Sequence, residues 1–187
     1  MRHISSRITR KTPRRRGGVA TLEMILVLPV FLIALMAIAQ FGLLLSNEQF
    51  VEMASRAGTQ VASRLTNISE TNGDPVPAAV LSAVGTELAR IGITDYSVRL
   101  EHNIDFDVIP PITPPVIGPV IVLESFVGTG PTNCPAPSAV ALAPNRMYVR
   151  VTVCVKSTEL TPNLLNTYGI DFSIRVSDET TLRRYAL

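Results

Sequence analysis

Hydrophobic residues run almost without interruption from Val19 to Leu45, the longest apolar stretch in the sequence. Its 27 residues contain one charged side chain, Glu23, and two other polar ones, Thr21 and Gln40. Because about 20 apolar residues in a helix cross the hydrocarbon core of a bilayer, the stretch predicts a membrane-spanning helix. No second stretch of this kind follows, so we expect a single-pass protein.

Beyond this stretch, apolar residues recur every three or four positions, which indicates one face of a continuing helix. This stripe consists of Phe50, Ala54, Ala57, Val61 and Leu65. We therefore expect an amphipathic extension over residues 46–66. Two partners suit its stripe: the domain of the same chain, or another subunit.

A polar break over residues 67–77 is rich in turn-forming residues. Asp74 and Pro75 are expected to open a second helix, because the fixed φ of proline suits a first helical turn. This helix has one apolar face, made of Val80, Leu81, Val84, Leu88 and Ile91, and Gly92 is expected to end it.

Alternation of apolar and polar residues predicts strands over 96–108 and 147–156. A short apolar strand is expected over 120–127 and a last strand over 170–182. Residues 67–187 therefore predict an α+β domain, with a helix packed on an antiparallel sheet of about four strands.

The proline-rich segment 110–119 is incompatible with a helix or a central strand. We interpret it as a stiff, extended connector, with an exposed recognition segment as the alternative.

Charge is distributed unevenly although the net charge is only +2. Residues 1–18 carry seven of the 17 Lys and Arg residues and no acid, which leaves ten basic against 15 acidic residues in the other 169 positions. Basic flanks of membrane helices stay in the cytoplasm. We therefore expect residues 1–18 to be a cytoplasmic leader, 19–45 the transmembrane helix, and the remainder extracytoplasmic. A nucleic-acid-binding arm is the alternative for the basic run, and topology already accounts for that run.

Both cysteines, Cys134 and Cys154, fall in the expected exterior part. In an oxidising compartment they would form a disulfide that closes a 21-residue loop, worth about 3 kcal/mol. Free structural thiols are the alternative.

Catalytic and metal-binding motifs are not evident in the sequence. The histidines are His3 and His102, without a cluster of ligands, and we expect His102 to be a partly buried structural residue. There is no glycine-rich phosphate loop and no nucleophile elbow. The sequence thus predicts neither an enzyme nor a bound metal or cofactor.

The apolar stretch has three interpretations. It suits an uncleaved anchor, or a secretory signal that is cut after Ala39, at the small-x-small sequence Ala37-Ile38-Ala39. Neither interpretation explains Glu23, because a carboxylate at membrane depth costs about 2–3 kcal/mol.

The third interpretation comes from a resemblance. Basic residues, then Gly18, then Glu23 at the head of a hydrophobic helix resemble a type IV prepilin leader. The resemblance implies cleavage by a prepilin peptidase between Gly18 and Val19. It also implies that Glu23 pairs with the N-terminal amine of a neighbouring subunit and sets the register of the helices.

The match is closer to the TadE-like family of minor pilins, through three runs of sequence: Gly17–Glu23, Leu26–Pro29 and Gln40–Gly42. Gln40 stands where the family more often has an acid. Pro29 is expected to kink the helix. Residues 147–184 resemble the closing strands of the family more weakly.

The resemblance implies a minor pilin or pseudopilin of a Tad (Flp) pilus in the bacterial inner membrane, with a periplasmic domain. The implied partners are pilin subunits, the prepilin peptidase, the inner-membrane assembly platform and lipid, and no nucleic acid. Two alternatives remain: a membrane-anchored binding module that contacts its partner through 110–119, or a secreted domain released after Ala39.

Overall fold

A computed structural model of the chain describes residues 17–105, 116–135, 146–162, 166, 169 and 176–184. It confirms the predicted α+β class, because a long apolar N-terminal helix precedes a small helix and a four-stranded antiparallel sheet. The chain divides into two compact units, Met1–Ala37 and Ile38–Leu187, and we describe each by itself.

Helix α1 comprises Gly17–Ala62, a total of 46 residues, and continues through Pro29. It ends four residues earlier than residue 66, where the sequence had placed its end. The amides of Arg64 and Leu65 bond to carbonyls three residues back, at 3.0 and 3.2 Å. Such bonds tighten a last turn and end a helix.

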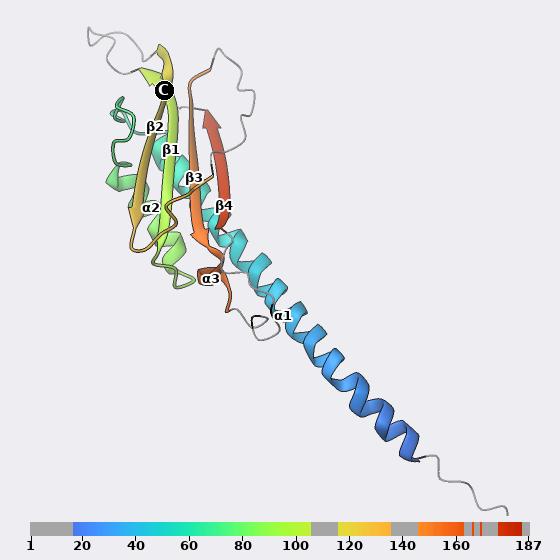
Figure 1. The fold of residues 1–187 in the computed structure, drawn as a ribbon. Coiled ribbons are helices and arrows are strands. Elements are labelled where there is room, and N and C mark those ends of the chain that lie inside the picture. Colours follow the sequence, from blue (N-terminus) through green and yellow to red (C-terminus); the bar gives the residue numbers. More distant parts are fainter. Residues whose placement is uncertain are drawn as a thin grey trace, which may run out of the picture. The chain divides into compact units, whose positions relative to one another are not determined.

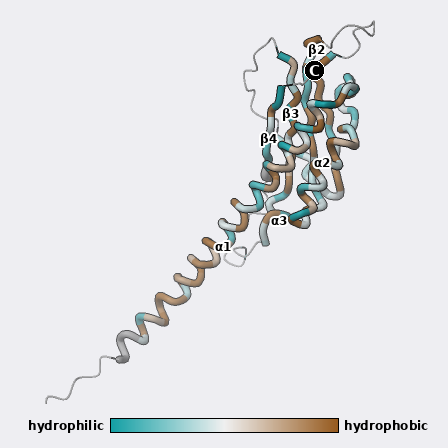
Figure 2. The backbone as a smooth tube through the Cα atoms, turned by 180° about the vertical axis from the view of Figure 1, so that it is seen from behind, coloured by the Kyte–Doolittle hydropathy of each residue, from teal (hydrophilic) through white to brown (hydrophobic). Residues whose placement is uncertain are grey.

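The sheet has the strand order β2-β1-β3-β4, and all three neighbouring pairs are antiparallel (Figure 1). The strands are β1 (Tyr96–Asp105), β2 (Val116–Val127), β3 (Tyr148–Lys156) and β4 (Val176–Arg184). Helix α2 (Ala78–Ala89) and the part of α1 in the second unit lie against one face of this sheet, as the reverse view shows (Figure 2). A short helix, α3 (Ser157–Leu160), follows β3 directly.

The hydrophobic core lies between these helices and the sheet. Its fully buried side chains come from every layer: Val51 and Ala54 of α1, Val80, Val84 and Leu88 of α2, Leu100 of β1, Leu123 of β2, and Val149, Val151 and Val153 of β3. Burying one such valine or leucine contributes about 1.5–3 kcal/mol. The apolar alternation predicted for the two central strands therefore faces the core.

The buried face of α1 differs from the predicted stripe. Ala54 is buried as expected, whereas the other four stripe residues are only partly buried. The face that meets the sheet is made of small and hydroxyl-bearing residues, Val51, Ala54, Ser55, Gly58, Thr59, Ala62 and Ser63. A Cβ placed on Gly58 would lie 2.7 Å from Cγ2 of Val84 and 3.2 Å from Cγ1 of Val151. The close approach of α1 to α2 and to β3 therefore selects small side chains here, whereas the hydropathy pattern favours large ones.

The second helix begins at Ala78, with Pro77 at its N-cap, so the predicted start at Asp74 and Pro75 was wrong. Asp74 instead follows the outer edge of β2, where its carbonyl accepts the Glu124 amide at 3.2 Å. The Val76 amide donates to Oγ of Ser125 at 2.8 Å. These bonds to β2 hold the segment outside the helix.

The proline-rich segment also ends differently, because β2 begins at Val116 and includes Pro119. This strand lies at the edge of the sheet, where proline is tolerated. The described part of the last strand is β4, Val176–Arg184, which ends two residues beyond the predicted end at residue 182. The predicted leader up to residue 16, residues 106–115 and most of 163–175 lie outside the described part of the chain.

The sheet face opposite the helices is also buried at its centre. Glu101 and Arg150, on neighbouring strands, are 4% and 8% exposed, and Nε of Arg150 donates to Oε2 of Glu101 at 2.8 Å. On the same face of β3, Cys154 forms a disulfide with Cys134, with 5.7 Å between the Cα atoms. The disulfide ties the segment after β2 to β3.

Candidate functional site

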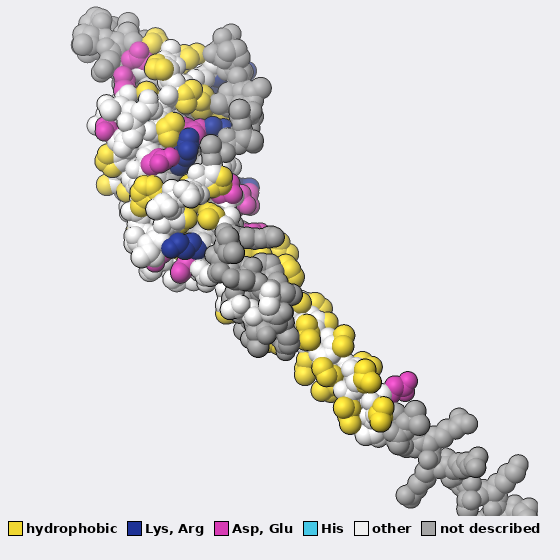
Figure 3. All heavy atoms as spheres, viewed as in Figure 1, with side chains coloured by type: hydrophobic (Ala, Val, Ile, Leu, Met, Phe, Trp, Pro, Cys, Tyr) yellow, Lys and Arg dark blue, Asp and Glu magenta, His cyan; other side chains and the backbone are white. Residues whose placement is uncertain are grey.

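The first part of α1 exposes its hydrophobic side chains. Between Leu22 and Ile38, the large apolar residues that are 58–70% exposed are Leu22, Met24, Ile25, Leu26, Val27, Val30, Phe31 and Ile38. Figure 2 shows that this part of the helix is hydrophobic in sequence, and Figure 3 shows its hydrophobic side chains on the surface. The helix is long and apolar enough to cross a membrane, and none of its most apolar part is buried. Apolar surface of this extent marks a membrane or protein contact.

The length of the apolar stretch fits a bilayer. The 27 residues from Val19 to Leu45 extend over about 40 Å at about 1.5 Å per residue. A hydrocarbon core is about 30 Å thick, so the stretch exceeds what one crossing requires. The surplus lies at one end or both ends of the crossing.

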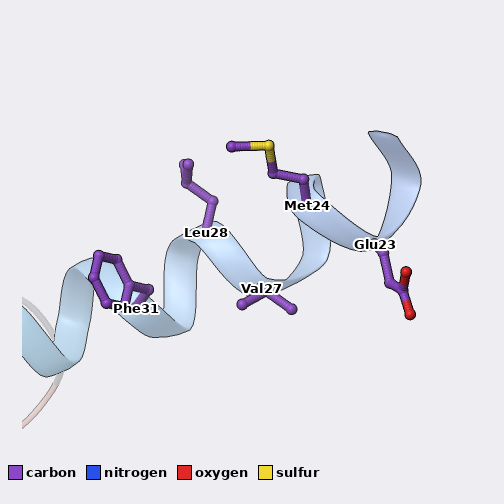
Figure 4. A pocket seen from close by; sticks show the side chains of 5 residues that line it. All are labelled: Glu23, Met24, Val27, Leu28 and Phe31. Atoms are coloured by element: carbon purple, nitrogen blue, oxygen red, sulfur yellow. The ribbon is translucent and has the colours of Figure 1, made fainter. Parts of the chain in front are cut away.

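Glu23 is the one charged residue among the described side chains from Thr21 to Leu45. It is exposed, and its carboxylate lies on the side of the helix away from Met24 and Leu28 (Figure 4). The surface around it is shared by Val27 and Phe31. All of these residues come from successive turns of α1, so they form a helix surface and not a ligand cavity.

Gly18 and Val19 lie in the first turn of α1, which begins at Gly17. Glu23 follows Val19 by four residues, so the two positions fall on one face of the helix, one turn apart. Pro29 lies within the same helix.

A comparison with protein families covers this part of the chain. Residues 18–60 match the TadE-like protein family. The TadE-like segment thus includes Gly18, Glu23 and Pro29, and it confirms the resemblance seen at the head of the helix. It does not extend to residues 147–184, where the weaker resemblance had been seen. No curated protein and no solved structure matches the chain.

The TadE-like segment indicates a component associated with a Tad pilus. It also contains both kinds of surface that α1 presents, the exposed apolar side chains up to Leu45 and the small residues that pack on the sheet.

The polar residues that hold the C-terminal part of α1 on the sheet domain, within the second unit, were not predicted from the sequence. The Asn47 side chain donates to the carbonyl of Leu160. Oγ of Ser55 donates to the carbonyl of Val151 at 2.8 Å and lies 3.0 Å from Oγ1 of Thr181. The signal was present, because Gln40, Asn47 and Ser55 are spaced by seven and eight residues and so share one helix face.

Titratable residues of the sheet have structural partners. Nε2 of His102 lies 2.9 Å from the carbonyl of Ser69, and its Nδ1 lies 3.3 Å from the amide of Ile104. Burial lowers the pKa of His102, which keeps the ring neutral, with Nε2–H donating and Nδ1 accepting. Among the described residues, no group of three His, Cys, Asp or Glu side chains is placed to hold a metal ion.

Proposed function

We propose that the chain is a minor pilin or pseudopilin of a Tad-type pilus and acts as a structural component, not as an enzyme. The supporting observation is the exposed apolar surface of α1 with Glu23 at its beginning, inside the TadE-like segment. An exposed apolar helix needs lipid or other helices around it. For a pilin subunit, lipid surrounds the helix in the membrane, and the helices of neighbouring subunits surround it in the filament.

The proposed mechanism begins with cleavage between Gly18 and Val19 by a prepilin peptidase. Cleavage removes the basic leader and leaves an α-amino group on Val19. The carboxylate of Glu23 on one subunit then pairs with this amine on its neighbour. An unpaired carboxylate at membrane depth costs about 2–3 kcal/mol, so pairing favours one axial register between adjacent helices.

The proposed location is the bacterial inner membrane, with the N-terminus in the cytoplasm and the sheet domain in the periplasm. The Cys134–Cys154 disulfide supports this orientation, because disulfides persist in oxidising compartments. The proposed partners are other pilin subunits, the prepilin peptidase, the assembly platform and membrane lipid.

Cleavage is tested by intact-mass analysis and N-terminal sequencing of the protein isolated from its host membranes. We expect the mature chain to begin at Val19. A Gly18→Leu variant should retain Met1, whereas the matched Gly17→Leu variant should still be processed. A wild-type chain that begins at Met1 would contradict cleavage, and one that begins at Gln40 would identify a secreted domain.

The role of Glu23 is tested separately by its neutral isostere. A Glu23→Gln variant should enter the membrane as the wild type does and be lost from the sheared pilus fraction. Glu52→Gln is the matched control, since Glu52 forms an exposed ion pair with Arg56 on the same helix. Normal incorporation of Glu23→Gln into pili would contradict the register role.

A further inference from the structure

One face of α1 contacts the domain of its own chain far into the apolar stretch. Gln40 is only 4% exposed, Leu44 packs against the core cluster, and Asn47 bonds to the carbonyl of Leu160. These residues and the fully buried Val51 follow one another at intervals of three and four, so they form a single helix face. The domain therefore reaches along α1 as far as Gln40.

The opposite face of α1 remains apolar beyond that point. Ile38 is 68% exposed and Leu45 is 62% exposed. The next exposed residue on this face is Gln49, and Met53 follows it. The outward face thus changes from apolar to polar after Leu45, whereas the domain-facing side already carries a polar residue at Gln40.

The change from apolar to polar residues therefore occurs at different positions along the helix axis on the two faces. The six residues from Gln40 to Leu45 cover about 9 Å of the helix axis. Within this band, the same turns contact the domain on one side and expose Phe41 and Leu45 on the other. Elements that lie in a membrane interface bury their apolar side by about 5–10 Å, a depth that matches the band.

We propose that the base of the sheet domain is seated in the lipid interface, with the outward side chains of residues 40–45 against the ends of the acyl chains nearest the headgroups. The inference rests on the proposed membrane anchoring. Lipid is the occupant that continuity favours, because the exposed apolar surface runs without a polar break from Met24 into this band.

This position of the domain in the lipid interface also explains why a polar residue, Gln40, lies inside the apolar stretch. A side-chain amide exposed to hydrocarbon loses its hydrogen bonds with water, and Gln40 avoids this because it is buried in protein. The membrane-spanning part then ends on the domain side at about Ala39 and on the outward side at Leu45.

The sequence contains no tryptophan, so a single introduced Trp reports the depth of one position. The full chain carrying Leu45→Trp is reconstituted in phosphatidylcholine vesicles, with and without phosphatidylcholine brominated near the ester end of its acyl chains. We expect blue-shifted emission and loss of most of it in the brominated vesicles. Met53→Trp, on the same face, should emit as in water and keep its intensity.

Ile38→Trp separates this inference from the anchoring on which it rests. If Ile38→Trp is quenched and Leu45→Trp emits as Met53→Trp does, residue 45 lies in water. The membrane anchor would then remain, but the proposed contact of the domain with the lipid interface would be refuted. Blue-shifted but unquenched emission at Leu45 means that protein covers the face, which also refutes that contact. If Ile38→Trp is unquenched as well, the anchoring itself is refuted.

Discussion

The two ends of helix α1 have similar secondary structure and opposite surroundings. From Met24 to Ile38 its large side chains are apolar and most of them are exposed, whereas from Val51 to Ala62 one face of small residues is buried against the sheet and α2. Leu32 and Met53 are both 49% exposed. Exposure alone therefore does not distinguish a lipid-facing position from a water-facing one, and the residues around it do.

The largest expected effect comes from placing the same charge in both regions. Leu32→Arg should oppose membrane insertion by about 3 kcal/mol, roughly a hundredfold in partitioning. Met53→Arg should insert normally, because exposed arginine residues already follow it on the same helix at Arg56 and just beyond the helix at Arg64. The measurement is the fraction retained in carbonate-washed membranes. Equal retention of both variants would show that the two regions share one environment.

A second comparison uses two glycines of α1. Gly58→Leu should destabilise the domain by about 2 kcal/mol, because the new side chain overlaps Val84 and Val151. Gly42→Leu should leave the stability unchanged or higher, since a Cβ there meets nothing within 4 Å. Urea unfolding of both variants in lipid nanodiscs checks this. A stable Gly58→Leu variant would contradict the close packing of α1 on the sheet.

The smallest effect concerns pH. Burial raises the pKa of Glu179 on β4, and the nearby Glu52 and Glu48 of α1 raise it further, with a smaller contribution from Asp178, while Arg56 opposes them. Because this carboxyl binds its proton more tightly in the folded state than in the unfolded state, its contribution to stability is complete at low pH and is lost as the pH rises through the folded pKa.

Glu179→Gln should therefore make the unfolding midpoint less dependent on pH above the ordinary value of 4.5. The matched control is Glu159→Gln on α3, an exposed residue. An unchanged pH profile in Glu179→Gln would show that ionisation of Glu179 does not affect the stability of the packing between α1 and β4.

Alternation predicted β1 and β3 because each of these strands turns one apolar face to the core. The alternation did not reveal that the polar face of these strands is buried as well. The Glu101–Arg150 ion pair and the Cys134–Cys154 disulfide each join residues that are distant in sequence, and a local pattern does not contain such contacts. The start of α2 was misjudged for a similar reason, because the bonds of Asp74 and Val76 to β2 override the local preference for a helix.

The candidate site was more accessible to sequence reasoning. Glu23 is conspicuous because it is the only charge in 27 residues, and Gly18 because of its distance from Glu23. Gln40 was harder to interpret, because only the three-dimensional packing shows that a polar residue in an apolar stretch faces the domain.

Hydrogen exchange of the full chain in lipid nanodiscs, measured along a urea titration, tests the account most directly. We expect urea that unfolds the sheet to release the amides of residues 48–62, whose protection depends on the domain, while residues 22–35 remain protected by the bilayer. Release of both segments in one transition would contradict an anchor held by lipid. Protection of residues 48–62 after the sheet unfolds would contradict their packing on the domain.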